Sequence, residues 1–173
     1  MKLRSLLFVL ATLFGAAAMA AEQVNVNYQY YGNHRADFSR VRGSLQLGEF
    51  SDERGLADES TIVEGYQAET GMSELLRNAL IQGFEHGDAT LVEGEGDFVV
   101  SGSLTSIETA EADDGIQLTM RVNLQLNRGG RTIWQTNLFG RGTAEDIATA
   151  THAALTRLIR ELMNDDYFLI ELQ

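Results

Sequence analysis

The stretch "IQLTMRVNLQLN", residues 116–127, alternates apolar and polar side chains without a break. One face collects Ile116, Leu118, Met120, Val122, Leu124 and Leu126, and the other collects Gln117, Thr119, Arg121, Asn123, Gln125 and Asn127. Successive side chains of a β-strand point to opposite faces, so the pattern predicts a strand with one buried and one solvent-facing side. A sheet that is wet on one face is typical of antiparallel pairing.

Turn signals on both sides of this strand predict a three-stranded meander. Before it, a short strand is expected over residues 89–93 and a long one over residues 97–109, and the long strand ends at the turn "EADDG". After it, "NRGGR" places Gly129 and Gly130 where a tight hairpin needs positive φ. The return strand is expected over residues 132–141.

Two amphipathic helices are predicted, one before and one after the meander. The first spans residues 71–86; Gly87 is expected to end it in the left-handed conformation, and Gly83 to let it approach a strand closely. The second opens at Thr143 with the capping-box-like "TAED". The apolar stripes are Met72, Leu75, Leu76, Ala79, Leu80, Gly83 and Phe84 in the first helix, and Ile147, Thr151, Ala154, Leu155, Leu158, Ile159 and Leu162 in the second.

The remaining segments complete an α+β prediction. Residues 24–30 alternate as a strand does and are expected to form an edge strand or an arm within residues 21–40, and "RGSLQLGEF" (42–50) predicts another strand. Residues 51–70 are acidic and irregular, with a short strand at 61–66. The apolar end, Tyr167–Leu172, should dock on the body or on a partner, as helix or strand. We therefore predict one domain over residues 21–173, a two-layer sandwich of a mainly antiparallel sheet with two helices on one face.

The first twenty residues have the pattern of a secretory signal peptide. A basic start with Lys2 and Arg4 precedes an apolar run over residues 6–18 and the small residues Ala18-Met19-Ala20. The run is shorter than the roughly 20 apolar residues that span a membrane, although a retained helix is the alternative. We expect cleavage after Ala20 and a periplasmic protein. A lipid anchor of the lipoprotein type needs a cysteine, and the chain has none.

The charge of the chain narrows the range of partners. Its formal net charge is −12, and removing Lys2 and Arg4 lowers it to −14. A surface of this sign repels nucleic acid and anionic lipid headgroups. A protein partner therefore fits the composition better than either.

Four sequence blocks in order resemble a known family. They are "LGEFSDERG", "MSELLRNALIQGFEHG", the meander and "AEDIATATHAALTRLIRELM", and together they extend over residues 41–168. This arrangement is similar to the YajG-like lipoproteins of Gram-negative bacteria, and its strand order resembles LptE and the auxiliary lipoproteins of lipid transporters. The resemblance implies a non-enzymatic partner of a larger envelope machine, with no catalytic residues to carry over. The chain departs from these proteins in lacking the lipid-bearing cysteine.

Several residues outside the meander's polar face are candidates for a site. Asp52 and Arg54, just beyond a strand, predict either a partner contact or a bidentate pair that ties the loop. Trp134 is either an anchor for a partner or a core residue. The acidic runs lack calcium-loop spacing, and His34, His86 and His152 lack zinc-ligand pairing, so we predict no metal and no cofactor.

The polar face of the meander carries the functional prediction. Asn123 and Gln125 lie among neutral polar groups, with Arg121 the one charge of that strand's polar face, in a strongly acidic chain. Such a face is either plainly solvated or kept free of acid to meet another protein. We predict a non-enzymatic periplasmic adaptor that binds an envelope protein. The alternatives are a carrier of a small apolar ligand or lipid, and a hydrolase with an unrecognised site.

Overall fold

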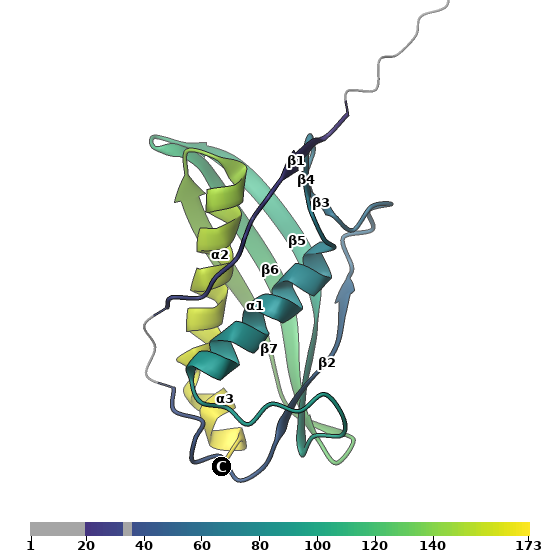
Figure 1. Cartoon of the computed structure of the whole chain (residues 1–173), viewed down its shortest axis with the longest axis vertical. Helices are drawn as coiled ribbons and strands as arrows, with labels where there is room; N and C mark the ends of the chain where they lie inside the picture. The colour runs from purple at the N-terminus through teal and green to yellow at the C-terminus, as the bar shows by residue number, and fades with distance from the viewer. Residues whose placement is uncertain (1–19, 33–35) are drawn as a thin grey trace, which may run out of the picture.

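The structure is a computed structural model that describes residues 20–32 and 36–173. Residues 1–19 of the expected signal peptide, and His34, lie outside the described residues. The main sheet has four strands in the order β2-β5-β6-β7, of which β2 runs parallel to β5 and the others are antiparallel (Figure 1). These strands are β2 (Leu45–Asp52), β5 (Phe98–Ala112), β6 (Gly115–Arg128) and β7 (Arg131–Ala144).

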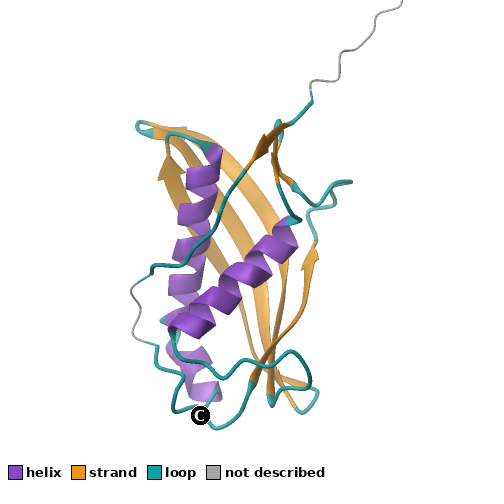
Figure 2. Cartoon of the chain, viewed as in Figure 1, coloured by secondary structure: helices purple, strands orange, loops and turns teal. Residues whose placement is uncertain are grey.

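The helices lie on one face of the main sheet. Helices α1 (Met72–His86) and α2 (Ile147–Met163) cross that face, and the short α3 (Asp166–Glu171) follows α2 (Figure 2). The predicted two-layer α+β sandwich is therefore confirmed. A second, small sheet has the order β1-β4-β3 and consists of β1 (Glu22–Val24), β4 (Tyr66–Ala68) and β3 (Thr61–Val63). Among the described residues, no helix combines the length and apolar character that a membrane crossing requires.

The core forms where the apolar face of β6 meets the two helices. Leu118, Met120, Leu124 and Leu126 have no exposed area, and Val122 has 1%. They face apolar stripes that are equally buried, namely Leu76, Ala79, Leu80 and Phe84 of α1 and Ala154, Leu155, Leu158, Ile159 and Leu162 of α2. The face assignment made from the alternation is confirmed at these positions. At the hairpin, Gly129 and Gly130 have φ of 57° and 74°, as the tight turn requires.

Of the two structures expected for the N-terminal alternation, an edge strand or an arm, most of the segment forms the arm. Only Glu22–Val24 pairs as a strand, and the chain after it is an arm that crosses the outer side of the helix layer (Figure 1). Its alternate side chains are still buried, Tyr28 at 8% and Tyr30 at 7% exposure. Gln82 of α1 fixes the arm because its amide accepts from the Tyr30 N–H at 2.9 Å and donates to the Tyr28 carbonyl at 3.2 Å. The arm contacts α2 as well, where the Tyr28 ring lies 4.8 Å from that of His152.

The first helix ends at His86 as predicted, but the conformation of Gly87 and the start of the second helix need correction. Gly87 has a φ of −92°, and the left-handed residue is Asp88, with a φ of 58°. The second helix begins at Ile147 and not at Thr143, because Thr143 is still part of the β6–β7 ladder, opposite Gln117. The Asp146 carboxylate caps that helix by accepting from the Thr149 N–H at 2.8 Å.

Three further expectations are refined. A methyl group on Gly83 would meet Ile159 and Met163, so this glycine permits close contact with α2 and not with a strand. The strand expected at residues 61–66 is two strands, β3 and β4, joined by a turn at Gly65. At residues 89–93, the described pairing is an isolated bridge between Leu91 and Leu45.

The C-terminal segment, left open between helix and strand, forms α3. Phe168 has no exposed area and Leu172 has 1%, so the segment docks on the body. Tyr167 and Ile170 of the same helix are 78% and 61% exposed. One side of α3 therefore joins the core, and the other carries apolar side chains in contact with solvent.

Candidate partner-binding face

The polar side chains of β6 lie on the face of the sheet that the helices leave uncovered. Asn123 pairs across the sheet with Ser103 of β5 and Asn137 of β7. Gln125 pairs in the same way with Ser101 and Gln135. Two rows of short hydroxyl and amide side chains thus cross three strands, and we call these six residues the outer face.

Hydrogen bonds between side chains hold part of the outer face in place. The Asn123 amide donates to Asn137 Oδ1 at 2.9 Å, and Asn123 Oδ1 accepts from Gln135 Nε2 at 3.4 Å. The Gln125 amide has no hydrogen-bond partner among the described residues, and it is half-buried. A docking partner would therefore meet one ordered amide cluster and one amide with free donors and acceptors.

A shallow depression of about 350 Å³ lies over the outer face on its β2 side. Its lining includes Asn123, Gln125, Ser101 and Ser103, together with Gly102, Ser51 and the carboxylates Glu49 and Glu53. Gly102 belongs to the inner side of β5, because it pairs with Leu124 and an added Cβ would lie 2.6 Å from Leu124 Cδ2. Only its backbone can line the depression, and the other lining groups are short polar side chains and the two carboxylates.

The outer side of the sheet is not as free of acid as β6 alone indicated. Glu49 comes from β2, and Glu108 of β5 forms an ion pair with Arg121 at 3.9 Å. Both side chains of that pair are more than half exposed, so the pair contributes little to stability. Phe139 of β7, opposite Arg121, adds an aromatic ring that is 53% exposed.

Asp52, the last residue of β2, forms a bidentate pair with Arg54 of the loop that follows. Their side chains are 2% and 5% exposed, and Arg54 Nη2 lies 2.5 Å from Asp52 Oδ2. Arg54 also donates to the Ile62 carbonyl at 3.0 Å, which ties the loop to β3. Burial alone would raise the pKa of Asp52, but the hydrogen bonds and charge of Arg54 hold it below its usual value. This geometry has the features of the loop-tying alternative.

Trp134 points to the opposite side of the sheet from the outer face. It lies on β7 with 9% exposure, and its ring centroid is 4.9 Å from that of Phe168 in α3. The structure thus brings Asn123 and Gln125 together. It places Trp134 in the core and the Asp52–Arg54 pair beside β3.

The sequence analysis missed the outer-face residues on the neighbouring strands. Ser101, Ser103, Gln135 and Asn137 are ordinary polar residues when each strand is considered alone. The turns "EADDG" and "NRGGR" could have identified these residues, because a hairpin turn fixes the register of the strands that it joins. Counting back from the turn at Gly129 and Gly130 places Asn137 near Asn123, although a register shift near Leu126 makes the count inexact.

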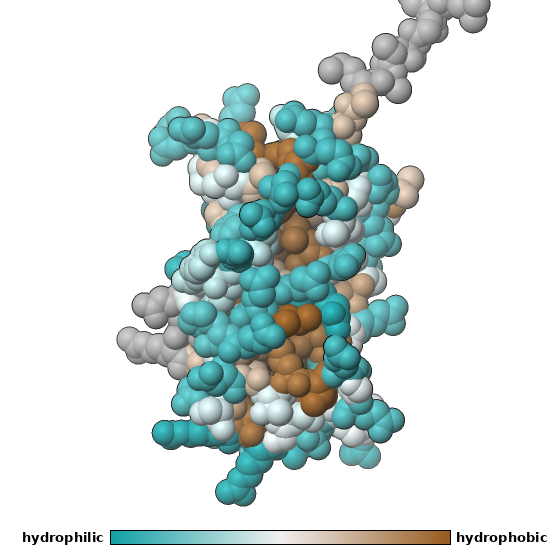
Figure 3. All heavy atoms as spheres, viewed as in Figure 1, coloured by the Kyte–Doolittle hydropathy of each residue, from teal (hydrophilic) through white to brown (hydrophobic). Residues whose placement is uncertain are grey.

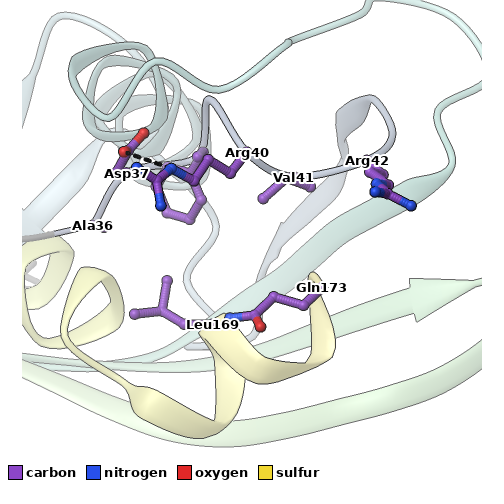
Figure 4. Close-up of a pocket in the computed structure, with 8 residues that line it drawn as sticks. Ala36, Asp37, Arg40, Val41, Arg42, Leu169 and Gln173 are labelled. Carbon is purple, nitrogen blue, oxygen red and sulfur yellow. Dashed lines mark ion pairs between the residues drawn. The ribbon is translucent and has the colours of Figure 1, made fainter.

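A second depression, of about 530 Å³, lies at the C-terminal end of the molecule. Figure 4 shows Leu169 and Gln173 facing the segment of residues 36–42, where Arg40 and Asp37 form an exposed ion pair at 4.0 Å. Its lining mixes apolar groups with Asp37 and two arginines. Within residues 20–32 and 36–173, no three His, Cys, Asp or Glu residues are grouped as metal ligands would be.

The family model of LptE, described as lipopolysaccharide-assembly, matches residues 59–165, which is more than half of the chain. The chain belongs to the LptE family. This is a family of bacterial envelope lipoproteins with no known enzymatic activity. The LptE part of the resemblance is thus confirmed, and the YajG-like part stays a prediction. The matched region contains Asn123, Gln125 and Trp134, whereas Asp52 and Arg54 precede it.

Solved structures share the fold at low sequence identity. XCC0632 from Xanthomonas campestris superposes with a TM-score of 0.66 at 15% identity over 87% of this chain and 97% of that one. The hypothetical protein CT253 from Chlamydia trachomatis gives 0.55 at 11% identity over 74% and 97%. PelC from Paraburkholderia phytofirmans, solved as a dodecamer, gives 0.51 at 13% identity over 76% and 92%. No match is found among curated proteins.

Proposed function

We propose that this LptE-family chain is a non-enzymatic periplasmic adaptor that binds another envelope protein through the outer face. The observation that carries the proposal is the outer face, six neutral amide and hydroxyl residues on the side of the sheet that the helices leave uncovered, in a chain of net charge −12. Carboxylates such as Glu49 and Glu53 border this face. Export with cleavage after Ala20 and a closer relation to YajG-like proteins are parts of the same proposal.

The geometry of the outer face supports protein binding. Serine, asparagine and glutamine side chains can be desolvated at lower cost than carboxylates, and each offers both donors and acceptors. The network around Asn123 is already ordered, so binding loses less side-chain entropy there. In this proposal Asp52 and Arg54 do not contact the partner directly, and they act by holding the loop after β2 in shape.

The structure gives less support to the two alternative functions, a carrier of an apolar ligand and a hydrolase, than to an adaptor. A carrier needs an apolar cavity, yet facing positions of the sheet and helices, such as Leu124 and Leu80, are fully buried in the core. The depression in Figure 4 has charged groups in its lining. A hydrolase needs titratable groups that converge in a cleft, and His86 and His152 instead contact the tyrosines of the arm.

A charge-insertion experiment tests the proposal. Asn123→Asp with Gln125→Glu changes the outer face by two charges, and desolvating these without counterparts costs on the order of several kcal/mol at an interface. Co-purification with crosslinked envelope proteins should therefore fall at least tenfold. The matched control is Gln23→Glu with Asn25→Asp, which makes the same chemical change at two exposed positions near β1. Equal recovery of partners by both variants would contradict the proposal.

A further inference from the structure

The two edges of the main sheet are protected very differently. At the β2 edge, Leu45 is fully hydrogen bonded, because its N–H donates to the Thr90 carbonyl at 2.8 Å and its carbonyl accepts from the Val92 N–H at 2.9 Å. Arg77 of α1 donates to the Leu47 carbonyl at 3.0 Å. A strand from another protein therefore finds the start of the β2 edge, at Leu45 and Leu47, already occupied.

The β7 edge has no such cover in the described part of the chain. Strand β7 is 14 residues long and ends the strand order, and among the described residues its backbone pairs with β6 alone (Figure 1). Proteins usually protect edge strands with proline, charged side chains, β-bulges, short length or a covering segment. Strand β7 contains no proline and no lysine, and its length is well above the roughly five to six residues typical of strands. Its two arginines and its register shift lie towards its ends, so the stretch of residues 134–140 between them has neither a charge nor a bulge.

Arginines gather beside this open edge. A depression of about 390 Å³ is lined by Phe139, Arg141 and Thr143 of β7 and by Arg157 and Arg160 of α2. Arg157 has an ion pair with Glu161 at 2.6 Å, whereas Arg141 and Arg160 have no carboxylate partner among the described residues. Strand β7 itself contains no acidic residue. The local charge is thus opposite to that of the protein as a whole.

We propose that the free edge of β7 is a docking site for an acidic, extended segment of a partner protein. Main-chain hydrogen bonds along β7 would add the segment to the sheet as a fifth strand. Its carboxylates would pair with Arg141 and Arg160, and an apolar side chain would contact Phe139. Charges are screened beyond about 8 Å at physiological ionic strength, so the arginines act locally despite the acidic remainder.

Charge also argues against a second copy of this chain as the occupant. Antiparallel pairing of two β7 strands would bring two arginine-bearing, acid-free strands together. Like charges directly opposite across strands destabilise the pairing. The proposal concerns an edge of the sheet and does not depend on the proposed role of the outer face.

A peptide titration on the full chain tests the site. The probe is a fluorescent peptide of about ten residues that alternates glutamate and valine, with a lysine–valine peptide and a proline-interrupted acidic peptide as controls. Fluorescence anisotropy should detect binding of the acidic peptide alone. Amide hydrogen exchange should slow across Arg131–Ala144, which a purely electrostatic contact would not produce.

Charge reversal gives the residue-level test. Arg141→Glu with Arg160→Glu should weaken peptide binding about tenfold, since two attractions become repulsions. The control Arg40→Glu with Arg42→Glu makes the same change in net charge on the 36–42 segment and should leave binding unchanged. Arg141→Glu alone gives a smaller loss and leaves α2 intact.

Four results would overturn the proposal. They are no detectable binding of the acidic peptide, equal binding of the proline-interrupted peptide, equal losses in both charge-reversal pairs, and unchanged exchange over β7. A concentration-dependent dimer with protected β7 amides and no peptide would instead assign this edge to a second copy.

Discussion

Leu124 and Asn123 are neighbours on β6, and they face opposite environments. Leu124 has no exposed area and packs in the core beneath the helices. Asn123 lies half-buried on the outer face, where it contacts two amides from β7. The inner side chains of this strand hold the layers together, whereas the outer side chains face solvent, where we propose that they meet a partner. Substitutions on the two sides should have correspondingly different effects.

The largest effect is expected at the inner side. Leu124→Ala and Leu80→Ala should each lower the free energy of unfolding by about 2–5 kcal/mol, because each leaves a cavity in a closely packed core. Denaturant titration measures the loss, and Thr119→Ala on the outer side of β6 is the control. Losses below about 1 kcal/mol at both leucines would mean that the two sides are assigned wrongly.

A smaller loss is expected where β7 touches α2. A Cβ on Gly140 would lie 2.8 Å from the Ala154 carbonyl carbon and 2.9 Å from Leu158 Cβ. Gly140→Ala should therefore force the layers apart and cost about 1–3 kcal/mol. Gly94→Ala is the matched control, because nothing lies within 4 Å of the added methyl group there. Equal melting temperatures for the two variants would contradict the close contact between β7 and α2.

The two acidic residues of β2, Asp52 with its buried side chain and the exposed Glu49, should differ in how much they stabilise the fold. Asp52→Ala leaves the nearly buried Arg54 without its carboxylate and should cost about 1–3 kcal/mol at neutral pH, whereas Glu49→Ala should cost almost nothing. Because Arg54 lowers the pKa of Asp52 in the folded state, this stabilisation is present above the usual carboxyl pKa of about 4. It disappears as the pH falls through the lowered value. The difference between wild type and Asp52→Ala should therefore shrink below about pH 4, and a constant difference would refute the role of the pair.

The smallest effect on stability is expected at the outer face. Asn123→Asp with Gln125→Glu should change the free energy of unfolding by less than about 0.5 kcal/mol, as substitutions on solvated surfaces usually do. Thermal melting provides the measurement. A loss above 2 kcal/mol would show that the amide network holds the fold together, and the outer face would then be a structural feature.

Most of the sheet and helix layers could be predicted from local patterns. The alternation over residues 116–126 and the stripes of both helices each lie within one element, so the sequence alone places their buried sides. The start of α2 could not be predicted in this way, because Thr143 and Asp146 are both good caps. Pairing of Ala144 with Ile116 decides between them, and that depends on how far the β6–β7 ladder extends.

The arm shows a limit of period-two patterns. Tyr28 and Tyr30 alternate with polar residues, and their burial follows that period. An extended chain in a groove between two helices has the same period as a paired strand, so the sequence could not distinguish them. Tertiary contacts with Gln82 and His152 make the segment an arm.

The candidate site was predicted one strand at a time. Asn123 and Gln125 could be placed on a solvent-facing side, because that depends on their own strand. Their partners Ser103 and Asn137 require the register of two neighbouring strands, and Glu49 requires the parallel addition of β2. Trp134 is covered by Phe168 of α3. The apolar sequence of the C-terminal segment does not show where that segment docks, so the burial of Trp134 could not be predicted.

Site-specific photocrosslinking tests the role of the outer face most directly. A photoreactive side chain at Gln125 reports what touches the outer face in intact cells, and the same group at Asn78, an exposed amide on α1, reports on the opposite layer. We expect one discrete adduct with an envelope protein from position 125, lost when Asn123→Asp is added, and none from position 78. Adducts from position 78 and none from position 125 would contradict the account and place the docking surface on the helices.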